Sequence, residues 1–384
     1  MKEWKKYKLG EILTVKYGKD HKKLDAGSIP VYGSGGLMRF VNSYICDSPS
    51  ILIPRKGSLN NVMYVEHPFW TVDTMFWTII DTTIAVPRFV YYAICKIDFE
   101  SLNVGSAVPS MTVPIIEDIE IFLPSLDEQK RIVKVLSSLE SKIELNRQIN
   151  DNLEQQAQAL YKSWFVDFEP FKDEEFVDSE LGMIPKGWSI GRIEDLTSRM
   201  ASGGTPKSMN PEFYSGNICW FTTKELVDGF LIDSEKHISQ SAIDNSAAKV
   251  FPKGSVLMAI YAAPTVGRLG ILSCNAAFNQ AAVALIPKTG IESGYIYLTL
   301  YNERNNFNNL SSGAAQQNLN VGLVKNYPTC IPSQEVLNDF DTKISPIFMN
   351  IERNQIEIFN LTRLRDTLLP KLMSGELKIN EIDS

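Results

Sequence analysis

The chain has 384 residues with 44% apolar and 22% charged side chains, a composition typical of a globular protein with two or three buried cores. Its longest apolar runs are far shorter than the roughly 20 residues of a membrane-spanning helix, and no apolar segment follows the lysine-rich start. The net charge of −7 argues against a nucleic-acid ligand for the chain as a whole, but the acidic excess lies within residues 125–186 and 333–384. We expect a soluble, cytoplasmic protein without a membrane partner, and the overall charge does not exclude a local anion-binding face.

Residues 1–124 are predicted to form a first globular domain of mixed helices and strands. Short runs rich in β-branched and aromatic residues alternate with turn residues, as in SILIP at 50–54 and FWTVDTMFWTII at 69–80. Between residues 16 and 60, lysines and arginines outnumber acidic residues. We therefore expect a curved or partly closed sheet, with a basic segment that is suited to binding an anion.

Residues 125–168 are predicted to form one long helix. Apolar residues and asparagines recur at alternating spacings of four and three, the heptad pattern of a coiled coil. At about 1.5 Å per residue, roughly 40 residues of helix make a rod about 60 Å long, too long for the core of one small domain. Ser125 as N-cap and Glu128 three residues later predict a capping box at its start, with Pro124 just outside.

The second part of the chain repeats this plan. An acidic linker at 169–187 leads to a second predicted domain at 188–332, a second helix at 333–376 and a C-terminal tail at 377–384. WSIGRIEDL at the start of this second domain resembles WKKYKLGEI at the start of the first. The second helix has a weaker N-terminal signal, and Pro346 inside its pattern predicts that it starts late or bends there.

An internal repeat with an offset of 208 connects the two halves. Residues 105–125 align without a gap on 313–333, so that Gly105 meets Gly313 and Pro124 meets Pro332. The heptad seam recurs in the same register. Its predicted residues are Leu136, Leu139, Ile143, Asn146, Leu153, Leu160, Ile344, Ile347, Ile351, Asn354, Leu361 and Leu368.

The predicted fold class is therefore α+β. Two mixed α/β domains are each followed by a long α-helix, and the two helices pack on each other as an antiparallel coiled coil. The whole forms a pseudo-twofold internal repeat.

Cysteines and histidines give no indication of a disulfide framework, a metal site or a catalytic triad. The five cysteines include no CxxC pair, and the three histidines have no paired spacing. No phosphate-binding GxxxxGK[ST] motif and no well-placed GxGxxG motif occurs. We expect buried free thiols in a reducing cytosol, and a non-enzyme without metal or cofactor of its own.

Side chains suited to reading DNA gather in loops of both predicted domains. Arginine and lysine bind phosphates or guanine, asparagine and glutamine bind adenine, and serine and threonine bind either. Glycine, threonine and asparagine also build turns, so a purely structural role is the alternative for each single residue. The candidates are Lys19, Lys22, Lys23, Ser34, Arg39, Arg55, Lys56, Ser58, Asn60, Asn61, Thr205, Lys207, Thr222, Thr223, Lys224, Tyr261, Thr265, Arg268, Asn279 and Gln280.

Several motifs together resemble the specificity subunit of Type I restriction-modification systems. They are LYKSWFVDFEPF followed by LGMIPKGW, the paired SGG-type loops, PSLDEQKRIV, and the twofold plan of a domain followed by a long helix. The resemblance covers essentially the whole chain. Departures from the family pattern are Pro346 in the second helix and Pro109 in a position where the later repeat has glutamine.

This resemblance implies a subunit that performs no chemistry itself. Each domain is a target recognition domain that reads one half of an asymmetric, bipartite double-stranded DNA site. The two helices set the gap between the half-sites and dock two modification methyltransferase subunits, which in the full complex join restriction translocase subunits. S-adenosylmethionine is then expected on the methyltransferase partner.

Two alternatives stay open at this point. One is a bifunctional enzyme with its own methyltransferase or nuclease activity, which the missing motifs disfavour. NPEFY at 210–214 lacks the second proline of the amino-methyltransferase motif, and helix capping explains the glutamate of the E-x-K triplet at 128–130. The other alternative is a coiled-coil adaptor that binds only proteins.

Overall fold

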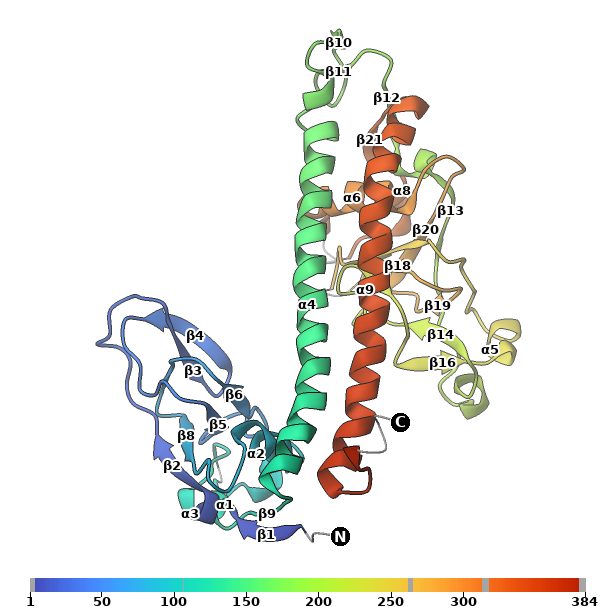
Figure 1. Cartoon of the computed structure of the whole chain (residues 1–384). Helices are drawn as coiled ribbons and strands as arrows, with labels where there is room; N and C mark the ends of the chain where they lie inside the picture. Colours follow the sequence, from blue (N-terminus) through green and yellow to red (C-terminus); the bar gives the residue numbers. More distant parts are fainter. Residues whose placement is uncertain (1–3, 106, 262–264, 313–317, 380–384) are drawn as a thin grey trace. The chain divides into compact units, whose positions relative to one another are not determined.

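The structure is a computed structural model of the whole chain, shown in Figure 1. The residues that it describes are 4–105, 107–261, 265–312 and 318–379. The prediction of mixed α/β domains, each followed by a long helix, is confirmed. In the described ranges no helix is both long enough and apolar enough to cross a bilayer.

The chain divides into two compact units, and each of them contains part of both long helices. One unit comprises the described parts of Met1–Ser141 and Leu361–Ser384, and the other comprises those of Lys142–Asn360. Helix α4 (Leu126–Phe165) and helix α9 (Gln334–Ser374) each contribute to both units. The first unit is therefore built from two distant segments of the sequence.

The first unit contains a four-stranded sheet of order β2-β8-β5-β6 and a three-stranded sheet of order β4-β3-β7. A separate antiparallel pair, β1 with β9, joins the N-terminal strand to the strand that leads into α4. The bounds are β1 Lys5–Lys8, α1 Leu9–Ile12, β2 Leu13–Tyr17, β3 Ile29–Gly33, β4 Gly36–Val41, β5 Ser50–Pro54, β6 Met63–Val65, β7 Trp70–Thr71, β8 Met75–Ile80, α2 Pro87–Ile94, α3 Val113–Glu117 and β9 Glu120–Leu123, with a 3-10 turn at Phe99–Leu102.

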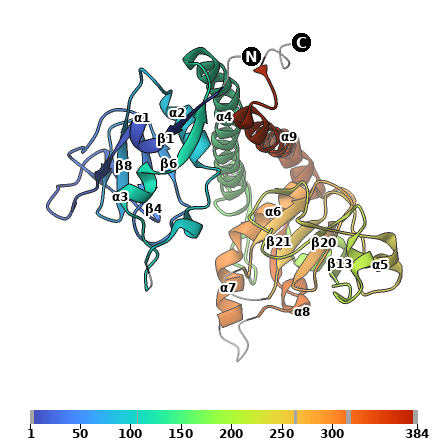
Figure 2. The ribbon, with the colours of Figure 1, turned by 90° about the horizontal axis from the view of Figure 1, so that it is seen from below.

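Both long helices complete the core of this first unit. Phe76 and Phe89 are fully buried in a cluster that also contains Leu136 of α4 and Leu372 of α9. Burial of each such side chain stabilises the fold by about 1.5–3 kcal/mol. Figure 2 shows α2 next to α4, where the hydroxyl of Tyr92 donates to the Glu140 carboxylate over 2.7 Å.

Gln129, within the PSLDEQKRIV motif, has a clear structural role. Its side chain is fully buried, and its Oε1 accepts from the backbone N–H of Val86 over 2.8 Å. Its Nε2 donates to the carbonyls of Pro124 (3.0 Å) and Ile84 (3.3 Å). The first turn of α4 is thereby attached to the segment before α2, so this glutamine positions the helix on the domain.

Both long helices begin at serine N-caps. The Ser125 hydroxyl accepts from the Glu128 N–H, and the Ser333 hydroxyl accepts from the Val336 N–H, each over 3.4 Å. Because α9 begins at Gln334, the expectation of a late start is wrong. Pro346 lies inside this helix without ending it.

The second unit is built around a five-stranded sheet of order β13-β20-β17-β18-β15 and a three-stranded sheet of order β16-β14-β19. Helix α6 is almost entirely buried against the larger sheet. The bounds are β10 Phe176–Val177, β11 Ile184–Pro185, β12 Ser189–Arg192, β13 Thr197–Ser202, β14 Ile218–Phe221, β15 Phe230–Leu231, β16 Lys236–Ile238, α5 Gln240–Asp244, β17 Val256–Ala259, β18 Leu269–Leu272, β19 Ala277–Phe278, β20 Ala282–Pro287, α6 Ser293–Asn302, α7 Arg304–Ser312, α8 Val321–Lys325 and β21 Pro328–Ile331, with 3-10 turns at Glu169–Phe171, Ile193–Leu196 and Pro211–Tyr214.

Within the second unit, α4 and α9 pack side by side in opposite directions (Figure 1). Phe165 near the end of α4 contacts Phe340 near the start of α9, with ring centroids 4.7 Å apart. Further along the pair, Asn150 and Asn354 are both buried, and the Asn354 Nδ2 donates to the Asn150 Oδ1 over 2.9 Å. Since an amide pair requires its partner opposite, these asparagines fix the register of the antiparallel helices.

A second polar contact stands one turn away from this pair. The Asn146 Nδ2 donates to the Glu357 carboxylate over 2.8 Å, and Glu357 also pairs with Lys142 at 3.4 Å. Of the predicted seam residues, half are buried and half are partly buried. The buried ones are Leu136, Ile143, Asn146, Ile344, Ile351 and Asn354, and the partly buried ones are Leu139, Leu153, Leu160, Ile347, Leu361 and Leu368.

The cysteines are free, but the expectation that they are buried is wrong. Cys95 is exposed and the other four are partly buried. Cys219 lies in β14 and Cys330 lies in β21, and sequence spacing gives no information on how deeply such positions are buried.

We predict that Asn354→Ala destabilises the chain by about 1–3 kcal/mol, because it leaves the buried Asn150 Oδ1 without its hydrogen-bond donor. Urea unfolding followed by circular dichroism measures this loss. The matched control is Asn360→Ala, at an exposed position of the same helix, which should change stability by less than about 0.5 kcal/mol. Equal effects of the two substitutions would contradict the role given to the pair.

Candidate nucleic-acid interface

In the first domain, the turn between β3 and β4 meets the loop that follows β5. The Asn61 Nδ2 donates to the Ser34 carbonyl over 2.8 Å. A Cβ on Gly57 would lie 3.0 Å from the Ser34 Oγ, and its φ of +90° favours glycine. Ser58 is exposed on the same loop. The fold therefore brings Ser34, Ser58 and Asn61 together from two predicted segments.

Arg55 lies on this loop and is held by an aromatic ring. Its guanidinium lies 5.4 Å from the ring centroid of Tyr17, and its Nη1 donates to the Asp73 carbonyl over 3.1 Å. Tyr17 itself is 55% exposed at the end of β2. An exposed ring with an arginine on its face is suited to stacking and to phosphate contact. The sequence analysis missed Tyr17, whose only signal was its place at the end of a strand.

The other candidates of the first domain differ in how available they are. Lys19, Lys22, Lys23 and Lys56 are exposed. Arg39 is partly buried and donates to the Leu24 carbonyl over 2.9 Å, so it holds the lysine-bearing loop. Asn60 uses both ends of its amide inside the domain, with Asp98 and with the Phe99 N–H.

In the second domain, three loops meet around Gln280. The Thr205 hydroxyl donates to the Gln280 Oε1, and both residues are exposed. The Tyr261 N–H donates to the Ala281 carbonyl over 3.3 Å, so the turn after β17 is adjacent. The Asn279 N–H donates to the Phe221 carbonyl over 2.9 Å, which adds the end of β14.

Two glycines are required for this arrangement. A Cβ at Gly203 would lie 2.1 Å from the Phe278 carbonyl oxygen, and one at Gly204 would lie 2.1 Å from the Ala247 carbonyl oxygen. A side chain at either position would clash with a backbone carbonyl oxygen that cannot move away without disturbing the fold. Both positions therefore require glycine. The SGG loop therefore places Thr205 next to Gln280, and Lys207 follows it on the exposed surface.

The remaining candidates in this domain serve the local fold to different degrees. Thr222 donates both its N–H and its hydroxyl to Glu225, and Thr223 is buried, whereas Lys224 is exposed. The Thr265 hydroxyl donates to the Tyr261 carbonyl over 3.2 Å, and Arg268 is partly buried after the same turn. Met209, two positions after Lys207, is 90% exposed.

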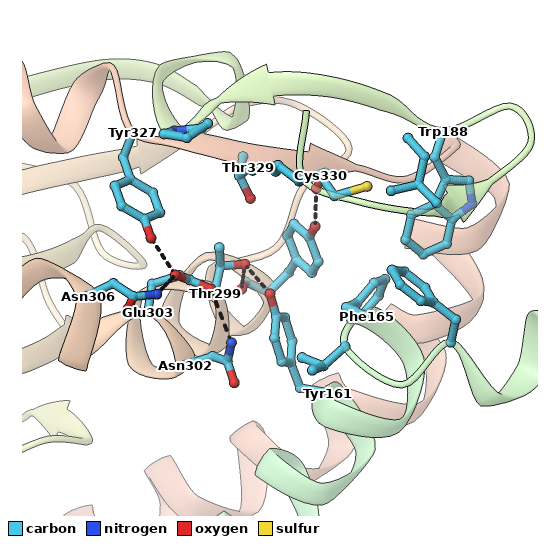
Figure 3. Close-up of a pocket in the computed structure, with 16 residues that line it drawn as sticks. Tyr161, Phe165, Trp188, Thr299, Asn302, Glu303, Asn306, Tyr327, Thr329 and Cys330 are labelled. Atoms are coloured by element: carbon cyan, nitrogen blue, oxygen red, sulfur yellow. Dashed lines mark hydrogen bonds between the residues drawn. The ribbon is translucent and has the colours of Figure 1, made fainter. Parts of the chain in front are cut away.

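A separate cavity of about 370 Å³ lies where α4 ends in the second unit, as Figure 3 shows. Tyr161, Phe165, Trp188 and Tyr327 line it, and Glu303 is its one carboxylate. The hydroxyl of Tyr327 and the amide of Asn306 both donate to Glu303, over 2.5 and 2.7 Å. Burial raises the pKa of Tyr327 to about 12, so its hydroxyl is neutral. Because Glu303 already accepts these hydrogen bonds, we assign it a structural role. Among the described residues that line the cavity, no nucleophile contacts a base.

The aromatic motif after α4 is explained by packing. Trp188 contacts Phe165 (5.8 Å between ring centroids), Phe168 (5.6 Å) and Phe171 (5.1 Å). Ile184 belongs to the same buried cluster. The aromatic residues of WFVDF and IPKGW therefore pack the linker against the end of α4. The role of this motif is structural.

Comparison with known proteins identifies a matching protein family and a solved structure with the same fold. The family described as "Type I restriction modification DNA specificity domain" matches residues 1–155 and 185–365. A crystal structure of a Type I restriction-modification S subunit from M. genitalium has the same fold, with a TM-score of 0.66, 16% identity and 96% of both chains covered.

Two curated relatives extend the match at the level of sequence. The chain is 30% identical over 341 residues to the Type I restriction enzyme MjaIX specificity subunit of Methanocaldococcus jannaschii, covering 87% of this chain and 78% of that protein. It is 26% identical over 330 residues to the HindI specificity subunit of Haemophilus influenzae, covering 70% and 71%. The repeated plan of the fold and these matches agree, and the chain belongs to the family of Type I restriction-modification specificity subunits.

Proposed function

We propose that this chain is the DNA-reading subunit of a Type I restriction-modification complex. Residues 1–124 and 188–332 act as target recognition domains, and each reads one half of an asymmetric, bipartite site in double-stranded DNA. Residues 125–168 and 333–376 are the spacer helices, 169–187 the linker and 377–384 the tail. The chain belongs to this family, and the observation that carries the proposal is that each domain brings exposed or partly exposed polar side chains from different loops to one place.

The chemistry of these loops supports recognition of a duplex. Gln280 and Thr205 offer an amide and a hydroxyl at one point of the second domain, and Lys207 offers a charge close by in sequence. An amide of this kind discriminates adenine by two hydrogen bonds, and lysine contacts phosphate without regard to sequence. Arg55 on Tyr17 supplies a comparable pair of charge and aromatic face in the first domain.

The helix pair gives the complex its spacing and its symmetry. Because the register is fixed by buried amides, the length of the rods is converted into a fixed number of base pairs between the half-sites. The internal repeat lets one chain present two similar surfaces, and two copies of the modification methyltransferase dock on them. Restriction translocase subunits join this core in the full complex.

The chemical steps belong to the partners. The methyltransferase subunits bind S-adenosylmethionine and flip the target adenine out of the duplex for methylation. This chain supplies recognition and geometry. Methylation by the purified chain alone would instead favour the alternative of a bifunctional enzyme, and absence of DNA affinity in the presence of the partner would favour an adaptor.

Mapping of methylated adenines in cells that carry this chain with its methyltransferase tests the proposal directly. We expect methylation at a single bipartite motif. Exchange of residues 1–124 for the corresponding domain of another family member should change one half-site and leave the other half and the gap unaltered. A change in both halves would contradict the division of labour between the domains.

Single substitutions in the second domain separate base reading from phosphate binding. We expect Gln280→Ala to cost about 1–3 kcal/mol and to relax the sequence preference at one position, because an amide contact to a base edge is lost. Lys207→Ala should weaken binding to all sequences alike and reduce the salt slope by about one. Fluorescence anisotropy with matched and mismatched duplexes measures both effects.

The control for these variants is Lys172→Ala, an exposed lysine of the linker outside the proposed interface. It should leave both affinity and salt slope unchanged. If Lys207→Ala behaves in the same way as Lys172→Ala, the interface lies elsewhere on the domain.

Removal of one heptad from each helix tests the spacing role. Deletion of residues 141–147 together with 357–363 keeps the Asn150–Asn354 pair and removes both partners of the Asn146–Glu357 contact. Seven residues correspond to about 10 Å of helix, or about three base pairs of duplex, so the methylated motif should have a gap about three base pairs shorter. An active complex with an unchanged gap would refute the idea that the coil measures distance.

A further inference from the structure

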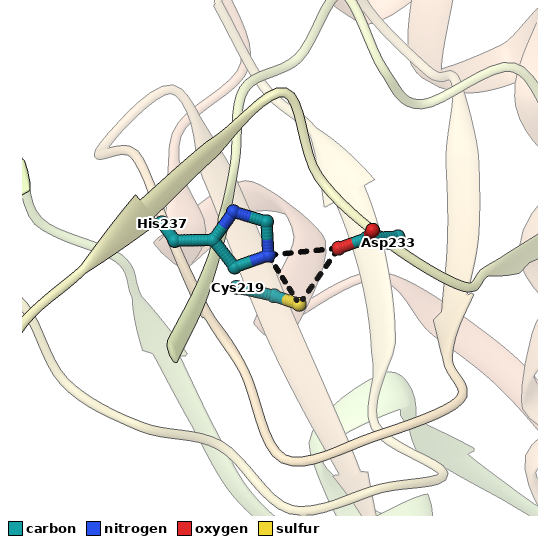
Figure 4. Close-up of side chains that lie close together, drawn as sticks. All are labelled: Cys219, Asp233 and His237. Atoms are coloured by element: carbon teal, nitrogen blue, oxygen red, sulfur yellow. Dashed lines mark hydrogen bonds and ion pairs between the residues drawn. The ribbon is translucent and has the colours of Figure 1, made fainter. Parts of the chain in front are cut away.

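Three side chains with metal-binding atoms converge in the small sheet of the second domain, as Figure 4 shows. Cys219 lies on β14, His237 lies on β16, and Asp233 lies in the connection before β16. The His237 Nε2 lies 2.8 Å from the Asp233 Oδ1 and 3.7 Å from the Cys219 Sγ, and the sulfur lies 3.5 Å from the same carboxylate oxygen. The three ligand atoms thus form a small triangle with one atom from each residue.

The backbone holds this triangle in place without a ligand. Cys219 and His237 are directly opposite each other in the antiparallel pair of β14 and β16. Asp233 is fixed by Ser234, whose N–H donates to the Asp233 Oδ1 over 2.9 Å. The Ser234 hydroxyl in turn accepts from the Trp220 N–H over 3.0 Å and so connects the loop to β14. The site is therefore built by the fold and is not a chance meeting of flexible side chains.

The distances fit a tetrahedral zinc ion. With Zn–S of about 2.3 Å and Zn–N and Zn–O of about 2.1 Å, the S···N and S···O separations are about 3.6 Å and the N···O separation about 3.4 Å. The two observed sulfur distances agree closely with these values. The nitrogen and the oxygen must move apart by about 0.6 Å, which an imidazole and a carboxylate that are each about one-third exposed allow.

A catalytic triad would need a different geometry. In a Cys-His-Asp triad the carboxylate and the thiol bind opposite nitrogens of the imidazole, so that a proton passes across the ring. Here both face Nε2, and the ring cannot connect them.

We propose that Cys219, Asp233 and His237 bind a zinc ion, with a fourth position open to solvent. Thiolate, imidazole and carboxylate are the ligands that zinc accepts, and one-third exposure of two of them gives the ion access. The sequence analysis predicted no metal site, because Cys219 and His237 are 18 positions apart and no paired spacing marks them. This inference does not depend on the proposed DNA-reading function.

A metal ion here would brace the loops next to the proposed interface. It would connect β14, β16 and the loop between β15 and β16. The same loop contacts Glu225, whose Oε1 accepts from the Glu235 N–H over 2.8 Å, and Glu225 holds Thr222 at the end of β14. The ion would therefore hold these strands and this loop together in the second domain.

Metal binding is tested on the full, untagged chain, prepared with a chelator under reducing conditions and then dialysed. We expect one zinc per chain by elemental mass spectrometry and calorimetry, and a higher melting temperature with zinc. Cobalt should give the near-ultraviolet charge-transfer band of a thiolate ligand and the intense visible bands of tetrahedral coordination. Cys274 packs against the same apolar cluster as Cys219, so the reductant also prevents a disulfide that would consume the ligand.

Substitutions assign the ligands. His237→Asn and Asp233→Asn, at partly exposed positions that the fold tolerates, should each weaken zinc binding at least about tenfold, and Cys219→Ser should abolish the charge-transfer band. The matched controls are His67→Asn and Cys330→Ser, which lie outside the cluster. Circular dichroism checks that each variant is folded. No stoichiometric zinc on the folded chain, or zinc binding that both asparagine variants leave unchanged, would overturn the proposal.

Discussion

The buried amide pair of Asn150 and Asn354 is the constraint on which the architecture of this chain depends. A seam of apolar side chains alone would allow the two helices to slide past each other by a heptad at small cost. A buried amide displaced from its partner costs about 1–3 kcal/mol, so sliding is penalised at this point. Asn354 is also the counterpart of Asn146 in the internal repeat. Each of the two helices therefore has an asparagine at the same position of its apolar seam.

The internal repeat is visible in these contacts as well. If the two helices are related by a twofold axis, the contact of 150 with 354 has its image in a contact of 146 with 358. Asn146 in fact bonds Glu357, one residue away. The symmetry is therefore approximate at the level of side chains.

Periodicity and repetition made the fold predictable, whereas the candidate site was only partly so. The heptads and the gapless repeat indicated two domains and two antiparallel helices, because these depend on local pattern. The meeting of Thr205 with Gln280 and the convergence of Cys219 with His237 depend on strand pairing between distant segments. Residue type identified both Gln280 and Thr205 as candidates, but nothing in the sequence indicated that their side chains meet. Gln129 was read as part of a motif, and only the structure shows that it attaches the helix to the domain.

The order in which the polypeptide is made has a consequence for the first unit. Leu372, Met373 and Ile379 are part of the same core as Phe76 and Phe89, and Trp4 lies against Gly375. The ribosome completes residues 1–124 early, but the hydrophobic core of the first unit closes only after Leu372, Met373 and Ile379 have been made. A truncation that removes Leu372, Met373 and Ile379 would therefore damage the domain at the opposite end of the sequence, although every residue of that domain would still be present.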